Sequence, residues 1–207
     1  MRSCRHVEWT WLDEGDGGFG WQTRERIPRT AHALLAGSRV WLIDPVDVDG
    51  LDERVRALGQ PGGVLQLLDR HNRDCAAIAE RHRVPHLRAW EQLAGAPFDA
   101  VPVRKSRVWR EAALWEPETR TLVCADVLGT LPSFCAPGER LGWHPLVRPF
   151  PPRSLAPFRP ERVLVGHGEA VFDRAAEALQ EAVDRGRRRL PAAWLAALRT
   201  IGSEASR

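Results

Sequence analysis

Residues 64–83 read VLQLLDRHNRDCAAIAERHR, and the fold prediction depends on this stretch. Its first five residues, Val64–Leu68, form a short apolar run that is typical of a buried strand. From Ala76 to Arg83 the apolar residues recur at helical spacing and are placed to face a core. The polar segment 69–75, DRHNRDC, therefore connects the end of a strand directly to the start of a helix.

Strand-like and helix-like segments follow one another on both sides of this stretch. Their order is typical of a sheet covered by helices. An acidic, glycine-rich loop or hairpin turn is expected at 13–20, and the proline-dense residues 131–160 are expected to be irregular. The part at 144–160 is compatible with either a lid or a packed connection. The expected strands cover residues 7–11, 31–36, 39–44, 64–68, 84–87, 98–103, 108–115, 122–126 and 162–165, and the expected helices cover residues 51–58, 76–83, 169–185 and 191–198.

Composition excludes several classes of protein. With 43% hydrophobic and 28% charged residues in 207, the chain is neither disordered nor collagenous, and its longest apolar run, Ala192–Leu198, is far short of the roughly 20 residues that cross a bilayer. The N-terminus lacks the apolar centre of a secretion signal, and the four cysteines form no CxxC pair. We expect a cytoplasmic protein with one domain over 1–207, its core at about 7–187 and a helical tail at 188–207.

Two further strand ends carry short motifs. The strand 122–124 runs into Ala125-Asp126, and the strand 163–165 runs into Gly166-His167-Gly168 before a long helix. Together with segment 69–75, these motifs resemble the metallo-β-lactamase fold family, whose strands end in His-x-His-x-Asp-His, then Gly-Asp, then Gly-His-Gly or a close variant. The resemblance covers about residues 7–187. It implies an α/β fold, an αββα four-layer sandwich with two mixed sheets face to face and helices on the outer faces.

Departures from the family pattern concern the first metal site. The two leading histidines of the family fall on Arg70 and Asn72, and the histidine after the aspartate falls on Cys75. A further family histidine is expected near residues 100–106, which contain none. The resemblance therefore implies that the first metal site is lost, and the arginine charge opposes a cation there. His71 falls on a spacer position and is expected to face elsewhere.

The second metal site of the family is better preserved. Its ligands map onto Asp74, Cys75, Asp126 and His167. The resemblance implies that these residues hold one divalent ion, zinc foremost, or that no ion is bound. Thiolate, imidazole and carboxylate groups are all competent zinc ligands. A metal-bound hydroxide would then hydrolyse an ester, thioester, amide or phosphoester.

Each of these ligands also has a structural interpretation. Asp74 could cap the helix that follows it, and Cys75 could be a small buried apolar residue. His167 could be hydrogen-bonded within a relic pocket, although its flanking glycines and its place at a strand end favour a site. We assign no role to the remaining histidines considered, His82, His86 and His144.

Two arginines of the same loop are candidates for substrate binding. Arg70 and Arg73 could hold an anionic group of a small substrate. Alternatively, either of them could pair with Asp126 in a vacated metal pocket, or Asp126 could simply close a turn.

Two function classes follow from these observations. The first is a metal-dependent hydrolase, and the second is a catalytically inactive family member that binds a small molecule or a protein. A nucleic-acid partner is disfavoured because the net charge is only +3 and the basic run Arg185–Arg189 fits a solvated helix end.

Overall fold

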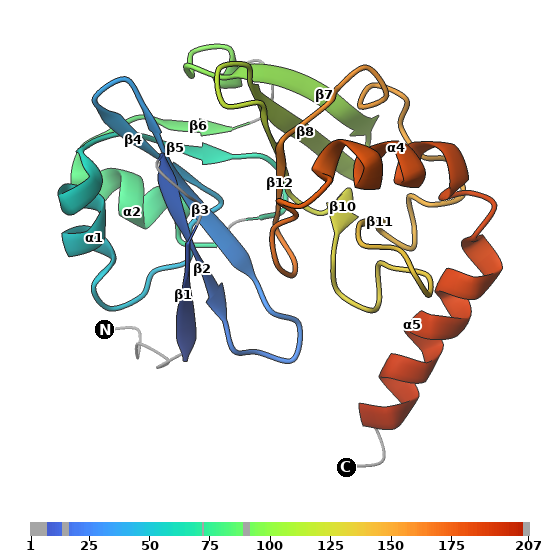
Figure 1. Cartoon of the computed structure of the whole chain (residues 1–207). Coiled ribbons are helices and arrows are strands. Elements are labelled where there is room, and N and C mark those ends of the chain that lie inside the picture. The colour runs from blue at the N-terminus through green and yellow to red at the C-terminus, as the bar shows by residue number, and fades with distance from the viewer. Residues whose placement is uncertain (1–7, 14–16, 72, 89–91, 205–207) are drawn as a thin grey trace.

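Four layers make up the protein (Figure 1). The computed structural model describes residues 8–13, 17–71, 73–88 and 92–204. Two sheets pack face to face, helices α1 (Leu51–Leu58) and α2 (Cys75–His82) cover the outer face of the first, and α4 (Ala175–Arg185) covers the second. This is the predicted αββα sandwich with mixed sheets.

The first sheet is built by the N-terminal half of the chain. Strands β1 to β4 are antiparallel neighbours, whereas β4, β5 and β6 are parallel because α1 and α2 form the crossovers between them. Asp44 and residues 67–71 therefore emerge at the same edge of the sheet. The sheet has the order β1 (Trp9–Asp13), β2 (Gly18–Thr23), β3 (Thr30–Ala36), β4 (Arg39–Ile43), β5 (Gln60–Gln66) and β6 (His86–Arg88).

The second sheet comes from the following part of the chain. Its order is β12 (Arg162–Val165), β9 (Thr121–Cys124), β8 (Trp109–Glu116) and β7 (Asp99–Ser106). Strands β12 and β9 are parallel, and Val165 pairs with Cys124. The residues that follow these two strands, Asp126 and His167, are consequently brought to one edge.

A short strand pair and a C-terminal helix follow from the later part of the chain. Strands β10 (Leu128–Gly129) and β11 (Gly142–Trp143) form a short antiparallel pair, and α5 (Leu190–Glu204) extends away from the body of the protein (Figure 1). None of the helices in the described part of the chain combines the length and apolar character that a bilayer crossing needs.

Two apolar clusters hold the layers together. The larger lies between the sheets and under α4, and it contains Leu65 and Leu68 from the first half of the chain with Leu114 and Leu164 from the second. The smaller lies between the first sheet and its helices. Because both faces of each sheet are covered, strands such as β9 and β12 are nearly continuous apolar runs rather than alternating ones.

The proline-dense segment is a packed connection. Val147 and Leu155 are buried, and the fully buried Arg148 guanidinium contacts both carboxylate oxygens of Glu139 at 3.0 and 2.6 Å. The same guanidinium donates to the carbonyl oxygen of Gly186 at 2.9 Å. These contacts fix the segment against the helix that follows β12.

Several sequence-based boundaries are corrected. The helix expected from residue 169 begins at Ala175, because Gly168 has a φ of 99° and Val171 pairs with Val163. Strand β2 occupies residues assigned partly to a loop. Its Gly18 allows close strand contact, since a Cβ there would lie 2.5 Å from the Ala33 carbonyl oxygen. The helix at 51–58 is confirmed.

The Gly63→Ala variant is expected to unfold more readily. A Cβ at Gly63 would lie 2.4 Å from Cζ3 of the Trp41 ring, which packs against Phe98, so the ring would have to shift. Overpacking of this kind costs about 1–3 kcal/mol. Urea unfolding measures the change, and Gly17→Ala, whose nearest neighbour would be 4.0 Å away, is the matched control. Equal free energies of unfolding for the two variants would contradict this packing argument.

Candidate metal centre

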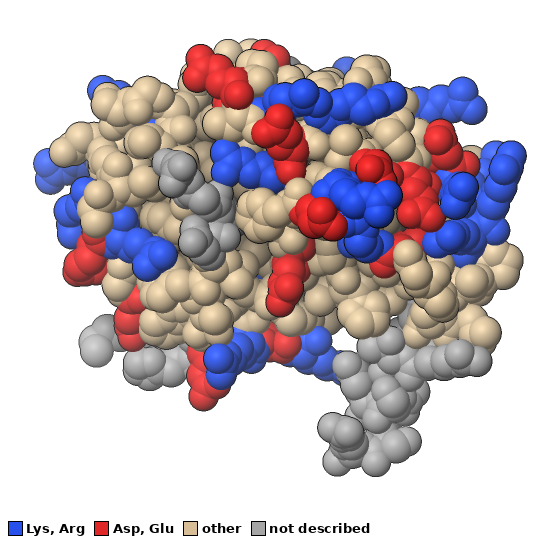
Figure 2. Space-filling model, in the orientation of Figure 1, with Lys and Arg blue, Asp and Glu red and all other residues tan. Residues whose placement is uncertain are grey.

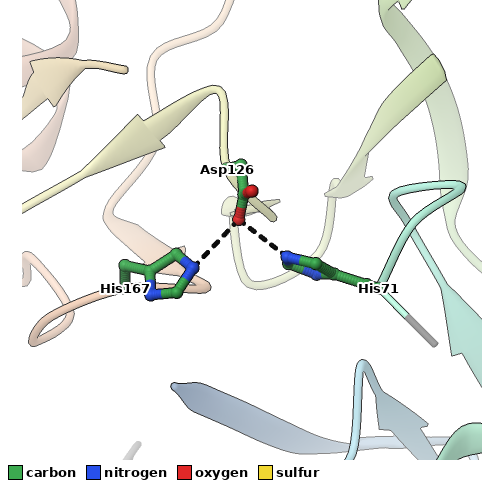
Figure 3. Close-up of side chains that lie close together, drawn as sticks. All are labelled: His71, Asp126 and His167. Atoms are coloured by element: carbon green, nitrogen blue, oxygen red, sulfur yellow. Dashed lines mark ion pairs between the residues drawn. The ribbon is translucent and has the colours of Figure 1, made fainter. Parts of the chain in front are cut away.

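Three side chains meet at the edge where strands of both sheets end (Figure 3). His71 lies in the loop after β5, Asp126 follows β9, and His167 follows β12. The Nε2 atoms of His71 and His167 lie 2.8 and 3.1 Å from Oδ1 of Asp126. One ligand atom from each residue lies within 4.8 Å of the others. We refer to these residues as the His–Asp–His cluster.

The Asp126 carboxylate is incompletely satisfied. Its Oδ1 atom is buried and has no hydrogen-bond partner among the described residues, although two imidazole nitrogens lie close to it. The Nε2 atoms of His71 and His167 are therefore close to Oδ1, but neither has the geometry of a hydrogen bond to it. A buried oxygen of this kind requires an explanation, and a cation shared by the three ligand atoms provides one.

The other nitrogen of each imidazole ring has a defined partner. Nδ1 of His167 lies 2.7 Å from the carbonyl oxygen of Pro28, which can only accept a hydrogen bond, so this nitrogen carries a proton. Nδ1 of His71 lies 3.2 Å from the carboxylate of Asp44, whose second oxygen accepts the Leu67 backbone N–H at 3.1 Å. Metal-binding histidines commonly have such outer partners, which direct Nε2 toward the metal.

Charge within the cluster shifts two pKa values in opposite directions. Burial lowers the pKa of His71, but the carboxylates of Asp44 and Asp126 outweigh it and raise this pKa to about 9. Burial would raise the pKa of Asp126, but contacts with the imidazoles of His167 and His71 hold it well below its usual range. Without a cation, the cluster is therefore an ionic arrangement of one carboxylate and its imidazole neighbours.

This arrangement predicts a pH effect on the metal-free protein. The folded-state pKa of His71, about 9, exceeds the ordinary 6.5, so its charge stabilises the fold fully below about pH 6.5 and the contribution is lost as pH rises through 9. We expect a loss of about 3 kcal/mol over this range. Urea unfolding in EDTA measures it. The His71→Gln variant should lose less stability over the same range, and equal losses would contradict the prediction.

A buried carboxylate supports the loop that carries Asp126. Oε1 of Glu111 on β8 accepts the backbone N–H groups of Ala125, Asp126 and Val127 at 3.1, 3.0 and 2.9 Å. Oε2 accepts the indole N–H of Trp109 at 2.8 Å. Burial raises the pKa of Glu111 to about 8, against the effect of these donors. The sequence signal that could have indicated this role is the position of Glu111 directly before the apolar run 112–114 of β8, on a strand whose residues 111–114 are all buried.

The structure brings together part of the ligand set implied by the sequence. Asp126 and His167 are in contact, as expected. Asp74 and Cys75 are not part of the cluster. The Asp74 carboxylate accepts the Asp47 backbone N–H at 2.8 Å and makes no capping hydrogen bond, although Asp74 is the N-cap residue of α2. The Sγ atom of Cys75 lies 3.8 Å from the His71 carbonyl oxygen. The thiol is buried, and this burial raises its pKa.

His71 occupies the place that the sequence pattern gave to other residues. The expectation that its side chain faces elsewhere is wrong, because its imidazole contacts both Asp44 and Asp126. No local signal in the sequence indicated this, since Asp44 is distant in the chain. Asn72, onto which a family histidine maps, lies outside the described residues.

The two arginines of the loop have different surroundings. The Arg73 guanidinium donates to the carbonyl oxygens of Thr30, Asp44 and Gly166 at 2.6, 2.8 and 3.3 Å, and so connects the two sheets. The Arg70 guanidinium lies 4.1 Å from the ring centroid of Trp109. Asp126 pairs with the two histidines, not with either arginine.

A cleft of about 720 Å³ opens beside the cluster. Its lining is mostly basic, with a single acidic residue. The lining residues are Glu25, Arg26, Ile27, Arg29, Arg70, His71, Arg73 and His167.

Comparison with known proteins identifies the fold. Neither a protein-family model nor a curated protein matches the sequence. Among solved structures, DIM-1 metallo-beta-lactamase matches with a TM-score of 0.60 and 11% identity, over 86% of this chain and 98% of that one. A metallo-beta-lactamase from Pontibacter korlensis gives 0.58 and 9%, over 85% and 99%. FIM-1 from Pseudomonas aeruginosa, in its mono-zinc form, gives 0.57 and 10%, over 87% and 97%.

The chain therefore has the metallo-β-lactamase fold, as the ordered strand-end motifs predict. Its sequence is a divergent one for this fold, since identity to these structures is only 9–11%.

Proposed function

We propose that the protein is a metal-dependent hydrolase that uses one divalent ion, zinc foremost, held by His71, Asp126 and His167. The observation that carries this proposal is the buried Oδ1 of Asp126, which lies between two imidazole nitrogens and lacks a hydrogen-bond partner among the described residues. Two imidazoles and one carboxylate are common zinc ligands, and three protein ligands leave a position open for water or substrate.

The proposed ligand set differs from the one that the sequence motif implies. His71 replaces Asp74 and Cys75, because His71 alone among these three contacts Asp126. The partners of the imidazoles, Asp44 and the Pro28 carbonyl, supply the outer contacts that such ligands need.

The ion, when bound, would lower the pKa of a water molecule and polarise the bond to be cleaved. The residues of the chain have supporting roles. Glu111 fixes the backbone of Asp126, while Arg73 ties the segment before His167 to the first sheet. These contacts hold ligands from distant segments in one geometry without rearrangement, which favours catalysis by preorganised groups. Esters, thioesters, amides and phosphoesters are the candidate substrate classes.

A nucleic-acid substrate is not part of this proposal. Figure 2 shows acidic and basic side chains interspersed over the face it presents, and the net charge of the chain is only +3. Nucleic-acid binding generally relies on a more continuous basic surface.

Zinc titration followed by a hydrolysis assay tests the proposal. Protein purified without a polyhistidine tag and stripped with EDTA should bind about one zinc per chain, and cleavage of 4-nitrophenyl acetate should depend on that zinc. The His86→Ala variant is the control. Its imidazole contacts Gln66 instead of the cluster, so its zinc content and activity should match the unaltered protein.

Two results would overturn the proposal. Zinc binding far below one per chain would remove the metal site. Stoichiometric zinc without hydrolysis of acetate, phosphate, thioester or amide test substrates would instead support a binding module that lacks catalysis.

A further inference from the structure

We propose that the cleft beside the His–Asp–His cluster binds a small substrate through an anionic group, a carboxylate or a phosphate, and that Arg70 holds this group. The term substrate rests on the proposed hydrolase function. The anion site itself rests on the surroundings of Arg70, which are independent of any metal.

The Arg70 guanidinium has N–H groups that can bind an anion. Its guanidinium stacks on the Trp109 ring at 4.1 Å, and one N–H lies 3.4 Å from the Val108 carbonyl oxygen. No carboxylate forms an ion pair with it among the residues that the structure describes. The side chain is exposed on the cleft, so its other N–H groups face solvent. A planar guanidinium with free N–H groups can bind a carboxylate or phosphate in a bidentate manner.

Two other arginines of the cleft are already engaged. Arg73 uses its terminal nitrogens on three carbonyl oxygens. Arg29 pairs with Glu25, with Nε 2.6 Å from the carboxylate. Glu25 is the one acidic residue of the lining and is paired, whereas the lining contains four arginines, so its formal charge favours an anion.

The platform beneath Arg70 is rigid. Trp109 is only 5% exposed, and its indole N–H donates to Oε2 of Glu111. Oε1 of the same carboxylate holds the backbone of Asp126. One buried side chain thus sets both the arginine platform and the candidate metal ligand, which fixes the anion site relative to the reacting centre. The cleft volume, about 720 Å³, suits a small molecule.

Calorimetric titration of inorganic phosphate and of succinate into zinc-free protein tests the site directly. We expect the Arg70→Gln variant to bind the preferred anion about tenfold or more weakly, because charge-assisted hydrogen bonds are lost. The Arg70→Lys variant should lose less affinity, since it keeps the charge but not the planar fork. The control is Arg39→Gln, which removes an equal charge at the opposite end of β4 from Asp44. If phosphate binds more tightly, the anionic group of the substrate is a phosphate, and if succinate binds more tightly, it is a carboxylate.

Kinetics of the zinc-loaded protein provide a second measurement. The ratio of kcat/KM for an anionic ester, 4-nitrophenyl succinate or 4-nitrophenyl phosphate, to that for neutral 4-nitrophenyl acetate should fall about tenfold in Arg70→Gln. The ratio should not change in Arg39→Gln.

The outcomes separate this inference from the proposed function. Equal anion affinity in Arg70→Gln and the unaltered protein, an equal loss in Arg39→Gln, or no anion binding at all would overturn the inference, even if zinc-dependent hydrolysis is found. Arg70-dependent anion binding in a protein that takes up no zinc would support the anion site and refute the hydrolase.

Discussion

The Asp126→Asn variant is expected to bind zinc at least a hundredfold more weakly than the unaltered protein. The substitution removes the charged ligand between two imidazoles, and loss of even an outer partner of a metal ligand typically costs about 10–100-fold in affinity. The fold should survive, because Glu111 bonds to the backbone of residue 126 and not to its side chain. Competition with a fluorescent zinc chelator measures the affinity.

Asp74→Asn is the matched control for this experiment. It makes the same chemical change at the aspartate that the sequence motif implies as a ligand but that bonds to the Asp47 backbone in the structure. Its zinc affinity should change less than about threefold, since it neither ligates nor supports a ligand directly. A large loss in both variants would restore the ligand set of the family pattern, and unchanged affinity in Asp126→Asn would refute the His–Asp–His cluster.

The Arg148→Met variant is expected to lose about 3–5 kcal/mol of stability, because it leaves the Glu139 carboxylate buried without a charged partner. Both side chains are almost fully inaccessible, at 0% and 1% exposed. The guanidinium also donates to the carbonyl oxygens of Phe134 and Gly186, at 2.5 and 2.9 Å, which would lose a donor. Guanidinium chloride unfolding monitored by tryptophan fluorescence measures the change.

A double variant separates the ion pair from simple packing. Arg148→Met combined with Glu139→Leu removes both charges, so it should be more stable than Arg148→Met alone. If the double variant is instead less stable by the sum of both single effects, the two side chains are not coupled and the argument fails.

Much of the fold could be predicted from local pattern. The strand ends expected at 68, 124 and 165, each followed by a characteristic polar motif, are features of the sequence itself. The structure ends these strands at 66, 124 and 165, and the sheets form from them. Strand β2 escaped prediction because its glycines resemble a loop. Gly18 allows close packing against β3, which becomes visible only when the partner strand is known.

The candidate site could be predicted only in part. Asp126 and His167 follow parallel neighbouring strands, and strand order alone brings their side chains together. The orientation of His71 depends on Asp44, a residue from another strand, and on the path of a loop. Family spacing therefore assigned the ligand role to Asp74 and Cys75, because spacing cannot report which way a loop side chain turns.

The division of the chain into two sheets has a consequence for how the protein folds. All strands of the first sheet come from residues before 89, and all strands of the second from residues after 98. His71 belongs to the first group, whereas Asp126 and His167 belong to the second. Because contacts of short sequence separation cost less loop-closure entropy, we expect pairing within each group to form before the two groups dock. The complete set of candidate ligands therefore exists only after the two sheets have docked. Metal binding during refolding would then report when docking is complete, and a bound ion would slow the separation of the sheets.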